Sequence, residues 1–123
     1  MNNKIFSTSI LGFIFFLTQS VWSQKLSITE EKFLEHKKAG DNFYTEEEWY
    51  LASQEYLKAA KLKPNDPHVN YLLAESYRKN LDYDDAEIWY KKTVTIPNNG
   101  YPYSLLFLGL MQKTNGKYIE AED

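Results

Sequence analysis

Cysteine is absent from the 123 residues of this chain. Its absence excludes disulfides, thiolate metal sites, a cysteine nucleophile and a lipid-modified N-terminal cysteine. The stability of the fold must therefore come from apolar packing, to which 43% hydrophobic and 16% aromatic residues can contribute. A chain of this length is expected to form one small domain at most.

The sequence also lacks a block of basic residues. Its formal net charge is −3, and lysine and arginine are spread along the chain. Nucleic acids and anionic membrane surfaces attract clustered positive charge, so we expect neither as a partner. A glycine-rich phosphate loop and a recognisable serine nucleophile turn are missing as well.

The first 23 residues differ from the rest of the chain. Lys4 precedes an apolar stretch at residues 5–17, and Val21 and Ser23 occupy the positions that a signal peptidase reads. This pattern predicts a signal peptide at residues 1–23, cleaved after Ser23. An uncleaved anchor is the alternative, but the apolar stretch is shorter than the roughly 20 residues of a spanning helix. We therefore expect no transmembrane segment after cleavage, and residues 24–32 form a lead-in.

Small and large residues recur at an interval of 34 positions. The pairs are Gly40 and Ala74, Phe43 and Tyr77, Trp49 and Tyr83, Ala52 and Ala86, and Tyr56 and Tyr90. A third copy begins with Gly109, Gly116, Tyr118 and Ala121, one residue late because of an insertion at residues 98–100. Such a period is typical of a helical repeat protein.

These positions resemble the tetratricopeptide repeat (TPR). The resemblance implies an all-α solenoid of helix-turn-helix units, with two full repeats at about residues 33–66 and 67–101 and a truncated third at 102–123. Thr93 stands where the family has a small alanine, and Pro97 falls one position early. These two departures are expected to loosen the junction between the second and third repeats.

Helix-start signals agree with paired helices. Ser27 with Glu30 and Thr45 with Glu48 are spaced as capping boxes, and Asp66 precedes Pro67 at a predicted first turn.

The acidic cluster at residues 82–85 is interpreted in the same way. Asp82 is expected to cap a helix whose buried stripe is Tyr83, Ala86, Trp89 and Tyr90. A calcium or other divalent site is the alternative, but the glycine and the distal glutamate of a known loop are lacking.

The predicted second helix of the third repeat would begin near Lys117, and only seven residues, 117–123, are left to form it. So short a helix buries too little apolar surface to form alone, and it would leave the aliphatic face of residues 103–111 uncovered. We expect the sequence to be the front part of a longer polypeptide or a shortened copy of one.

In tetratricopeptide arrays the first helix of each repeat lines a groove that holds a peptide. The resemblance carries this partner-binding role to Lys37, Asp41, Tyr44, His68, Tyr71, Glu75, Arg78, Lys79, Tyr103, Leu106 and Lys113, with Leu34 and Leu110 beside them. Tyrosine, arginine, lysine and apolar contacts suit a protein or peptide. Asp41 would repel a carboxylate, which argues against a ligand held by its C-terminus. Ordinary solvated helix faces are the alternative.

No catalytic set is recognisable. His36 and His68 belong to different repeats, and neither has a carboxylate or nucleophile at a spacing that suggests catalysis or metal binding. We therefore expect no enzyme activity, no metal and no cofactor.

The signal pattern together with tyrosine-rich repeats is similar to the N-terminal segment of Bacteroidetes OmpA-like envelope proteins, some of which are associated with type IX secretion. This resemblance implies a periplasmic, outer-membrane-associated scaffold that binds an envelope protein or peptide, and peptidoglycan through a C-terminal domain outside these residues. The alternative is a helical support module in an envelope-assembly or carbohydrate-uptake component.

Overall fold

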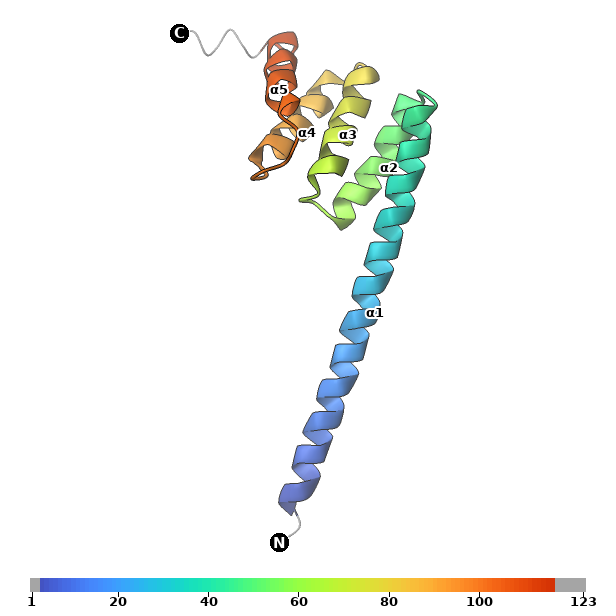
Figure 1. Ribbon diagram of the computed structural model, residues 1–123, viewed down its shortest axis with the longest axis vertical. Helices are drawn as coiled ribbons and strands as arrows, with labels where there is room; N and C mark the ends of the chain where they lie inside the picture. Colours follow the sequence, from blue (N-terminus) through green and yellow to red (C-terminus); the bar gives the residue numbers. More distant parts are fainter. Residues whose placement is uncertain (1–2, 117–123) are drawn as a thin grey trace. The chain divides into compact units, whose positions relative to one another are not determined.

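Residues 3–116 contain five α-helices in a computed structural model of the chain (Figure 1). The structure describes the backbone of residues 3–116 and the side chains of residues 10–116. The helices are α1 (Asn3–Thr45), α2 (Trp49–Leu62), α3 (Pro67–Lys79), α4 (Tyr83–Thr95) and α5 (Tyr103–Thr114). Residues 3–116 contain no strand, so the predicted all-α repeat fold is confirmed.

The chain divides into two compact units, Met1–Glu31 and Lys32–Asp123. In the first unit, residues 10–28 are all exposed, among them Phe13, Phe16 and Trp22. No helix among the described residues is both long and apolar enough to span a bilayer. The cleavage of residues 1–23 stays a prediction.

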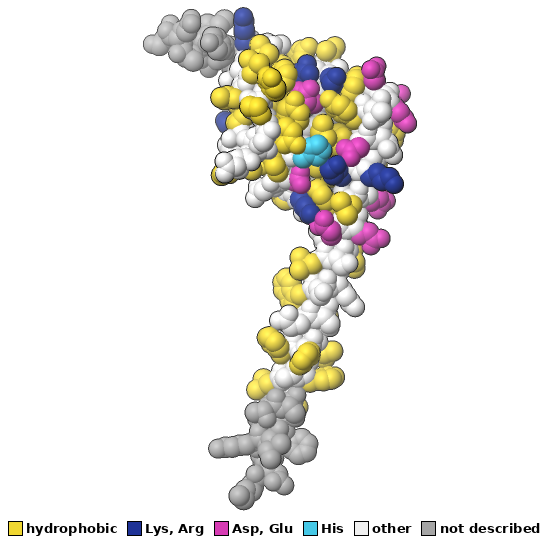
Figure 2. Space-filling model, viewed as in Figure 1, with side chains coloured by type: hydrophobic (Ala, Val, Ile, Leu, Met, Phe, Trp, Pro, Cys, Tyr) yellow, Lys and Arg dark blue, Asp and Glu magenta, His cyan; other side chains and the backbone are white. Residues whose placement is uncertain are grey.

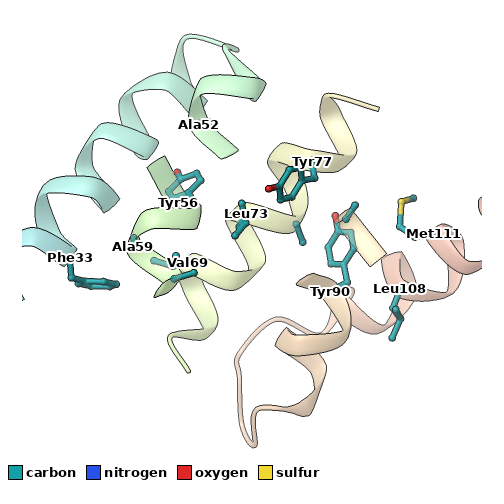
Figure 3. Packing of buried hydrophobic residues seen from close by; sticks show 13 residues of the cluster. Phe33, Ala52, Tyr56, Ala59, Val69, Leu73, Tyr77, Tyr90, Leu108 and Met111 are labelled. Atoms are coloured by element: carbon teal, nitrogen blue, oxygen red, sulfur yellow. The ribbon is translucent and has the colours of Figure 1, made fainter. Parts of the chain in front are cut away.

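The second unit has one continuous core. It runs from Phe33 in α1 through Tyr56 in α2, Leu73 in α3 and Tyr90 in α4 to Met111 in α5 (Figure 3). Each helix from α2 onward packs against the next one in the sequence. This sequential packing is what a helical repeat requires, since each helix pair covers the apolar side of its neighbour.

Gly40 shows why the repeat needs a small residue in its first helix. A Cβ at this position would lie 2.6 Å from Cδ1 of Tyr56, whose ring is fully buried. The glycine thus lets α1 and α2 approach closely. Ala74, its counterpart in the second repeat, is also fully buried.

Turns within the helix pairs confirm the register of the repeat. The backbone is left-handed at Glu47 (φ 61°), at Leu81 (φ 68°) and at Gly116 (φ 73°). The first two turns are 34 residues apart, and the third comes one residue late, as the insertion predicts. The insertion itself contains two more positive-φ residues, Asn98 and Gly100. Tyr118, Ala121 and the helix expected near Lys117 lie outside the described residues.

Predicted helix caps are confirmed in part. Asp66 caps α3 as expected: its Oδ1 accepts a hydrogen bond from the backbone N–H of Val69 at 2.8 Å, and Pro67 occupies the first turn. Asp82 stands at the N-cap of α4, although its carboxylate accepts from Asn80 Nδ2 rather than from the helix backbone. Of the predicted stripe on α4, Ala86 and Tyr90 are buried, and Tyr83 and Trp89 are partly buried.

The two capping boxes predicted from serine and threonine are wrong. Ser27 lies inside the continuous helix α1, so no helix begins there. Thr45 is the last residue of α1, and its hydroxyl donates back to the carbonyl of Asp41. The next helix starts after Glu48, which makes no side-chain cap bond. The first helix is longer at both ends than the capping residues suggested, and a helix interior offers no unpaired N–H to cap.

Candidate functional site

The candidate site is the face formed by the predicted partner-binding residues of α1, α3 and α5, which we call the partner face. Its members are Leu34, Lys37, Asp41 and Tyr44 from α1; His68, Tyr71, Glu75, Arg78 and Lys79 from α3; and Tyr103, Leu106, Leu110 and Lys113 from α5. These helices present the same repeat positions, but the structure gives those positions different environments.

One hydrogen bond occurs in both complete repeats. Tyr56 of α2 donates its hydroxyl to Asp41 Oδ1 at 2.8 Å, and Tyr90 of α4 donates to Glu75 Oε1. Donors and acceptors are each 34 positions apart, so the bond follows the repeat. In each repeat it ties a carboxylate of the partner face to the core residue of the paired helix.

A cation accompanies each of these carboxylates. Lys37 Nζ lies 2.9 Å from Asp41 Oδ2, one helical turn away. Arg78 binds Glu75 with two nitrogens, Nη2 to Oε2 at 2.7 Å and Nε to Oε1 at 3.1 Å. Each carboxylate is therefore neutralised within its own helix, and such fork-like arginine pairs are the stronger kind.

The two carboxylates differ in solvent exposure. The side chain of Glu75 is 7% exposed and that of Asp41 is 41% exposed. Glu75 therefore holds α3 and α4 together and presents little of its charge to a partner. Asp41 can still contact one.

The tyrosine pKa values reflect this arrangement. Burial, followed by the hydrogen bond to Glu75, raises the pKa of Tyr90, and burial followed by the bond to Asp41 raises the pKa of Tyr56. Burial and the nearby Glu75 raise the pKa of Tyr44 to about 12. Ionised tyrosines are disfavoured because their charge would be desolvated and would face a carboxylate.

Lys79 is held by aromatic rings at the junction of the first two repeats. Its Nζ lies 4.3 Å from the centre of the Trp49 ring and 5.7 Å from that of Tyr44, and these two rings meet edge to face. Cation–π contacts of this kind position an ammonium without neutralising it. Within residues 10–116 no carboxylate pairs with Lys79.

Tyr101 is a member of this surface that the sequence analysis missed. It follows the insertion at residues 98–100, stacks on Tyr71 with ring centres 4.6 Å apart, and its hydroxyl pairs with His68 Nδ1. The insertion thus folds an aromatic side chain onto α3, covering two predicted contact residues. The sequence signal for this fold of the loop was the insertion itself, whose Asn98 and Gly100 are residue types that adopt a left-handed backbone.

The α5 section of the partner face is apolar and exposed. Leu110 stands where α1 has Asp41 and α3 has Glu75, and Leu106 stands where they have Lys37 and Tyr71. Tyr103 is 64% exposed, Leu106 57% and Leu110 45%. Hydrophobic side chains gather over α5 in the view of Figure 2, whereas charges of both signs lie over α1 and α2.

The histidines have protein partners. His36 Nδ1 lies 2.7 Å from Glu55 Oε2, and Lys58 binds the other oxygen of that carboxylate. Burial pushes the pKa of Glu55 upward, but the hydrogen bonds from Lys58 and His36 outweigh it, so this pKa is lowered. In the part of the chain that the structure describes, no three His, Asp or Glu side chains are grouped as metal ligands.

Comparison with known proteins finds no matching family model and no matching curated sequence. The functional interpretation therefore rests on the repeat, the partner face and the predicted signal peptide.

Proposed function

We propose that this chain is a non-catalytic tetratricopeptide-type scaffold of the bacterial cell envelope, which binds a protein or peptide on its partner face. The observation that carries the proposal is the exposed row Tyr103, Leu106 and Leu110 on α5. In α1 and α3 the corresponding polar groups are bonded internally. Exposed apolar residues that continue such a face are typical of a protein contact.

The predicted export signal supports the envelope location. Residues 5–17 supply its apolar core, and Val21 and Ser23 its cleavage signal. Mass spectrometry of the exported chain should find a mature protein that begins at Gln24. A chain that stays in the cytoplasm with Met1 intact would contradict the proposed location.

Site-specific photo-crosslinking tests the contact surface. A benzophenone side chain is placed at Leu106 or Tyr103, and for comparison at Lys91, which is exposed on α4. In cells that naturally contain the chain, the two α5 positions should yield the same crosslinked protein, identified by mass spectrometry. Lys91 should not yield it.

The captured protein is then purified and mixed with the chain. Leu106→Ser should weaken binding at least tenfold, because an apolar contact at the interface is lost, with an unchanged far-UV circular dichroism spectrum. Equal crosslinking from Lys91 and Leu106, or no crosslink from α5, would refute the proposed surface.

Arg78 and Tyr71 are poor choices for such a test. Arg78 neutralises the buried Glu75, and Tyr71 stacks on Tyr101. Their removal would disturb folding and binding together, whereas Leu106 lies outside these networks.

A further inference from the structure

A hollow of about 400 Å³ opens where the C-terminal end of α3, the start of α4 and one side of α5 meet. We call it the Leu110 pocket. Its lining includes Arg78, Lys79, Leu81, Phe107, Leu110 and Met111. These residues come from two repeats, so the pocket exists only when the helix pairs are stacked.

The pocket has an apolar floor and apolar edges. Met111 belongs to the core and Phe107 packs against it, with the Phe107 ring 5.5 Å from that of Tyr90. Leu110 and Leu81 remain exposed at the edges. An aliphatic or aromatic side chain of a partner could therefore exchange water for apolar contacts on several sides.

Leu81 is an unexpected residue for its position. It is 70% exposed and adopts a left-handed backbone (φ 68°), which disfavours residues that carry a Cβ. The corresponding turns carry Glu47 and Gly116. Neither burial nor turn geometry explains a leucine here, but an apolar contact with a partner would.

Among the residues that the structure describes, two cations and no carboxylate line the pocket. Arg78 lies 4.8 Å from the Phe107 ring centre and is already neutralised by Glu75. Lys79 is held by Trp49 and Tyr44, and no carboxylate among residues 10–116 pairs with it. Asp82, in the neighbouring turn, is engaged by Asn80.

Resting on the proposed function, we infer that the Leu110 pocket receives an apolar side chain of a partner protein, next to an aspartate or glutamate whose carboxylate pairs with Lys79. The apolar side chain contributes burial, and the carboxylate contributes complementarity and register. The partner segment is thus recognised by an apolar–acidic pair rather than by a chain terminus.

A peptide library tests this specificity. Random twelve-residue peptides with blocked termini are selected on the full chain at low salt. The selected peptides should be enriched in leucine, isoleucine or phenylalanine adjacent to aspartate or glutamate. In the best peptide, replacing the acidic residue by lysine should weaken binding at least tenfold, and raising the salt from 50 to 500 mM should remove most of the preference for the acid.

Matched variants locate the binding. Lys79→Glu should reverse the preference from acidic to basic peptides, and Leu110→Ser should weaken all selected peptides. Lys91→Glu makes the same charge change on the exposed surface of α4 and should leave binding unchanged. Far-UV circular dichroism and thermal melting are recorded for each variant, so that unfolding is recognised.

Other results would overturn the inference. Selected peptides without an apolar–acidic pair would do so, as would a preference that persists in both Lys79→Glu and Leu110→Ser. If decanoate displaced the selected peptides at a concentration equal to theirs, the pocket would be assigned to a small amphiphile instead of a partner protein. If Leu106→Ser abolishes peptide binding while Lys79→Glu and Leu110→Ser leave it unchanged, the proposed function stands and the Leu110 pocket is not the binding site. If no peptide and no crosslinked protein is found, both fail.

Discussion

The first and second helix pairs contain the same three-part arrangement of tyrosine, carboxylate and cation. In the first pair Asp41 is partly exposed, and Lys37 contacts it through one nitrogen. In the second pair Glu75 is buried and accepts hydrogen bonds from two nitrogens of Arg78. Equivalent positions of the repeat thus differ in exposure: Asp41 keeps part of its carboxylate at the surface, whereas Glu75 is buried, and both are bonded to the paired helix.

The start of the third repeat extends the comparison. Leu110 replaces the carboxylate, and the cation at the position of Arg78 is Lys113. With no carboxylate at that position, α5 gives the partner face an apolar end. Moving along the face from α1 to α5, polar contacts give way to hydrophobic ones.

The largest effect is expected from alkaline pH, which acts on both complete repeats. The pKa values of Tyr44, Tyr56, Tyr71, Tyr77, Tyr90 and Tyr101 are all raised, first by burial. The increase is largest for Tyr44, Tyr56 and Tyr90, so above pH 10 these three stay protonated in the folded chain and ionise in the unfolded chain. The free energy of unfolding therefore falls as pH rises, by about 1.4 kcal/mol per pH unit for each such tyrosine.

Urea unfolding between pH 8 and 11, followed by far-UV circular dichroism, measures this dependence. The decline should begin near pH 10 and continue toward pH 12, the range set by Tyr44. Tyr56→Phe and Tyr90→Phe serve as controls: each removes one of these tyrosine hydroxyls and should make the slope shallower. An unfolding free energy that stays level from pH 9 to 11 would contradict the assignment.

Arg78→Ala compared with Lys37→Ala tests the difference in burial directly. Removing Arg78 leaves the buried Glu75 without its counter-charge, which should cost about 3 kcal/mol of unfolding free energy. Removing Lys37 affects an exposed pair and should cost less than about 1 kcal/mol. Chemical unfolding at pH 7 measures both. Similar losses for the two variants would mean that the two arrangements do not differ as their burial indicates.

Tyr90→Phe compared with Tyr56→Phe separates the hydrogen bond from the ion pair. The Glu75 carboxylate cannot replace the lost hydroxyl with water, so Tyr90→Phe should cost about 2 kcal/mol. Asp41 remains accessible to water, so Tyr56→Phe should cost about 1 kcal/mol. Thermal melting gives the ranking, and the reverse order would show that water reaches Glu75 and not Asp41.

Sequence reasoning found the repeat because small residues such as Gly40 and Ala74 are dictated by close helix contacts and recur visibly. It also placed the late third copy correctly, since the turn at Gly116 needs a left-handed backbone. Helix starts were harder to predict. Ser27 and Thr45 have the right chemistry for a cap, but α1 continues through Ser27 and ends at Thr45, whose hydroxyl donates to the carbonyl of Asp41 in the preceding turn.

The internal roles of the partner face could not be predicted in the same way. Asp41 and Tyr56 are distant in sequence and belong to different residue classes, one a contact candidate and one a core aromatic. Their bond depends on how α1 and α2 cross, which a sequence period does not specify. Tyr101 was missed for a related reason: the path of an inserted loop depends on the surface it meets, here Tyr71 and His68.

Gly109→Ala is the smallest expected effect and tests where the comparison between repeats ends. Gly40 and Gly109 hold the same repeat position, but nothing in the described part of the chain comes within 4 Å of a Cβ built on Gly109. Alanine there should raise the unfolding free energy by about 0.5–1 kcal/mol, because glycine inside a helix is less favourable. Gly40→Ala, whose Cβ would meet the Tyr56 ring, should lower it by about 1–3 kcal/mol. Denaturant midpoints of the two variants should therefore move in opposite directions. A loss at both positions would mean that Gly109, like Gly40, stands at a close contact and that the two positions are equivalent in packing.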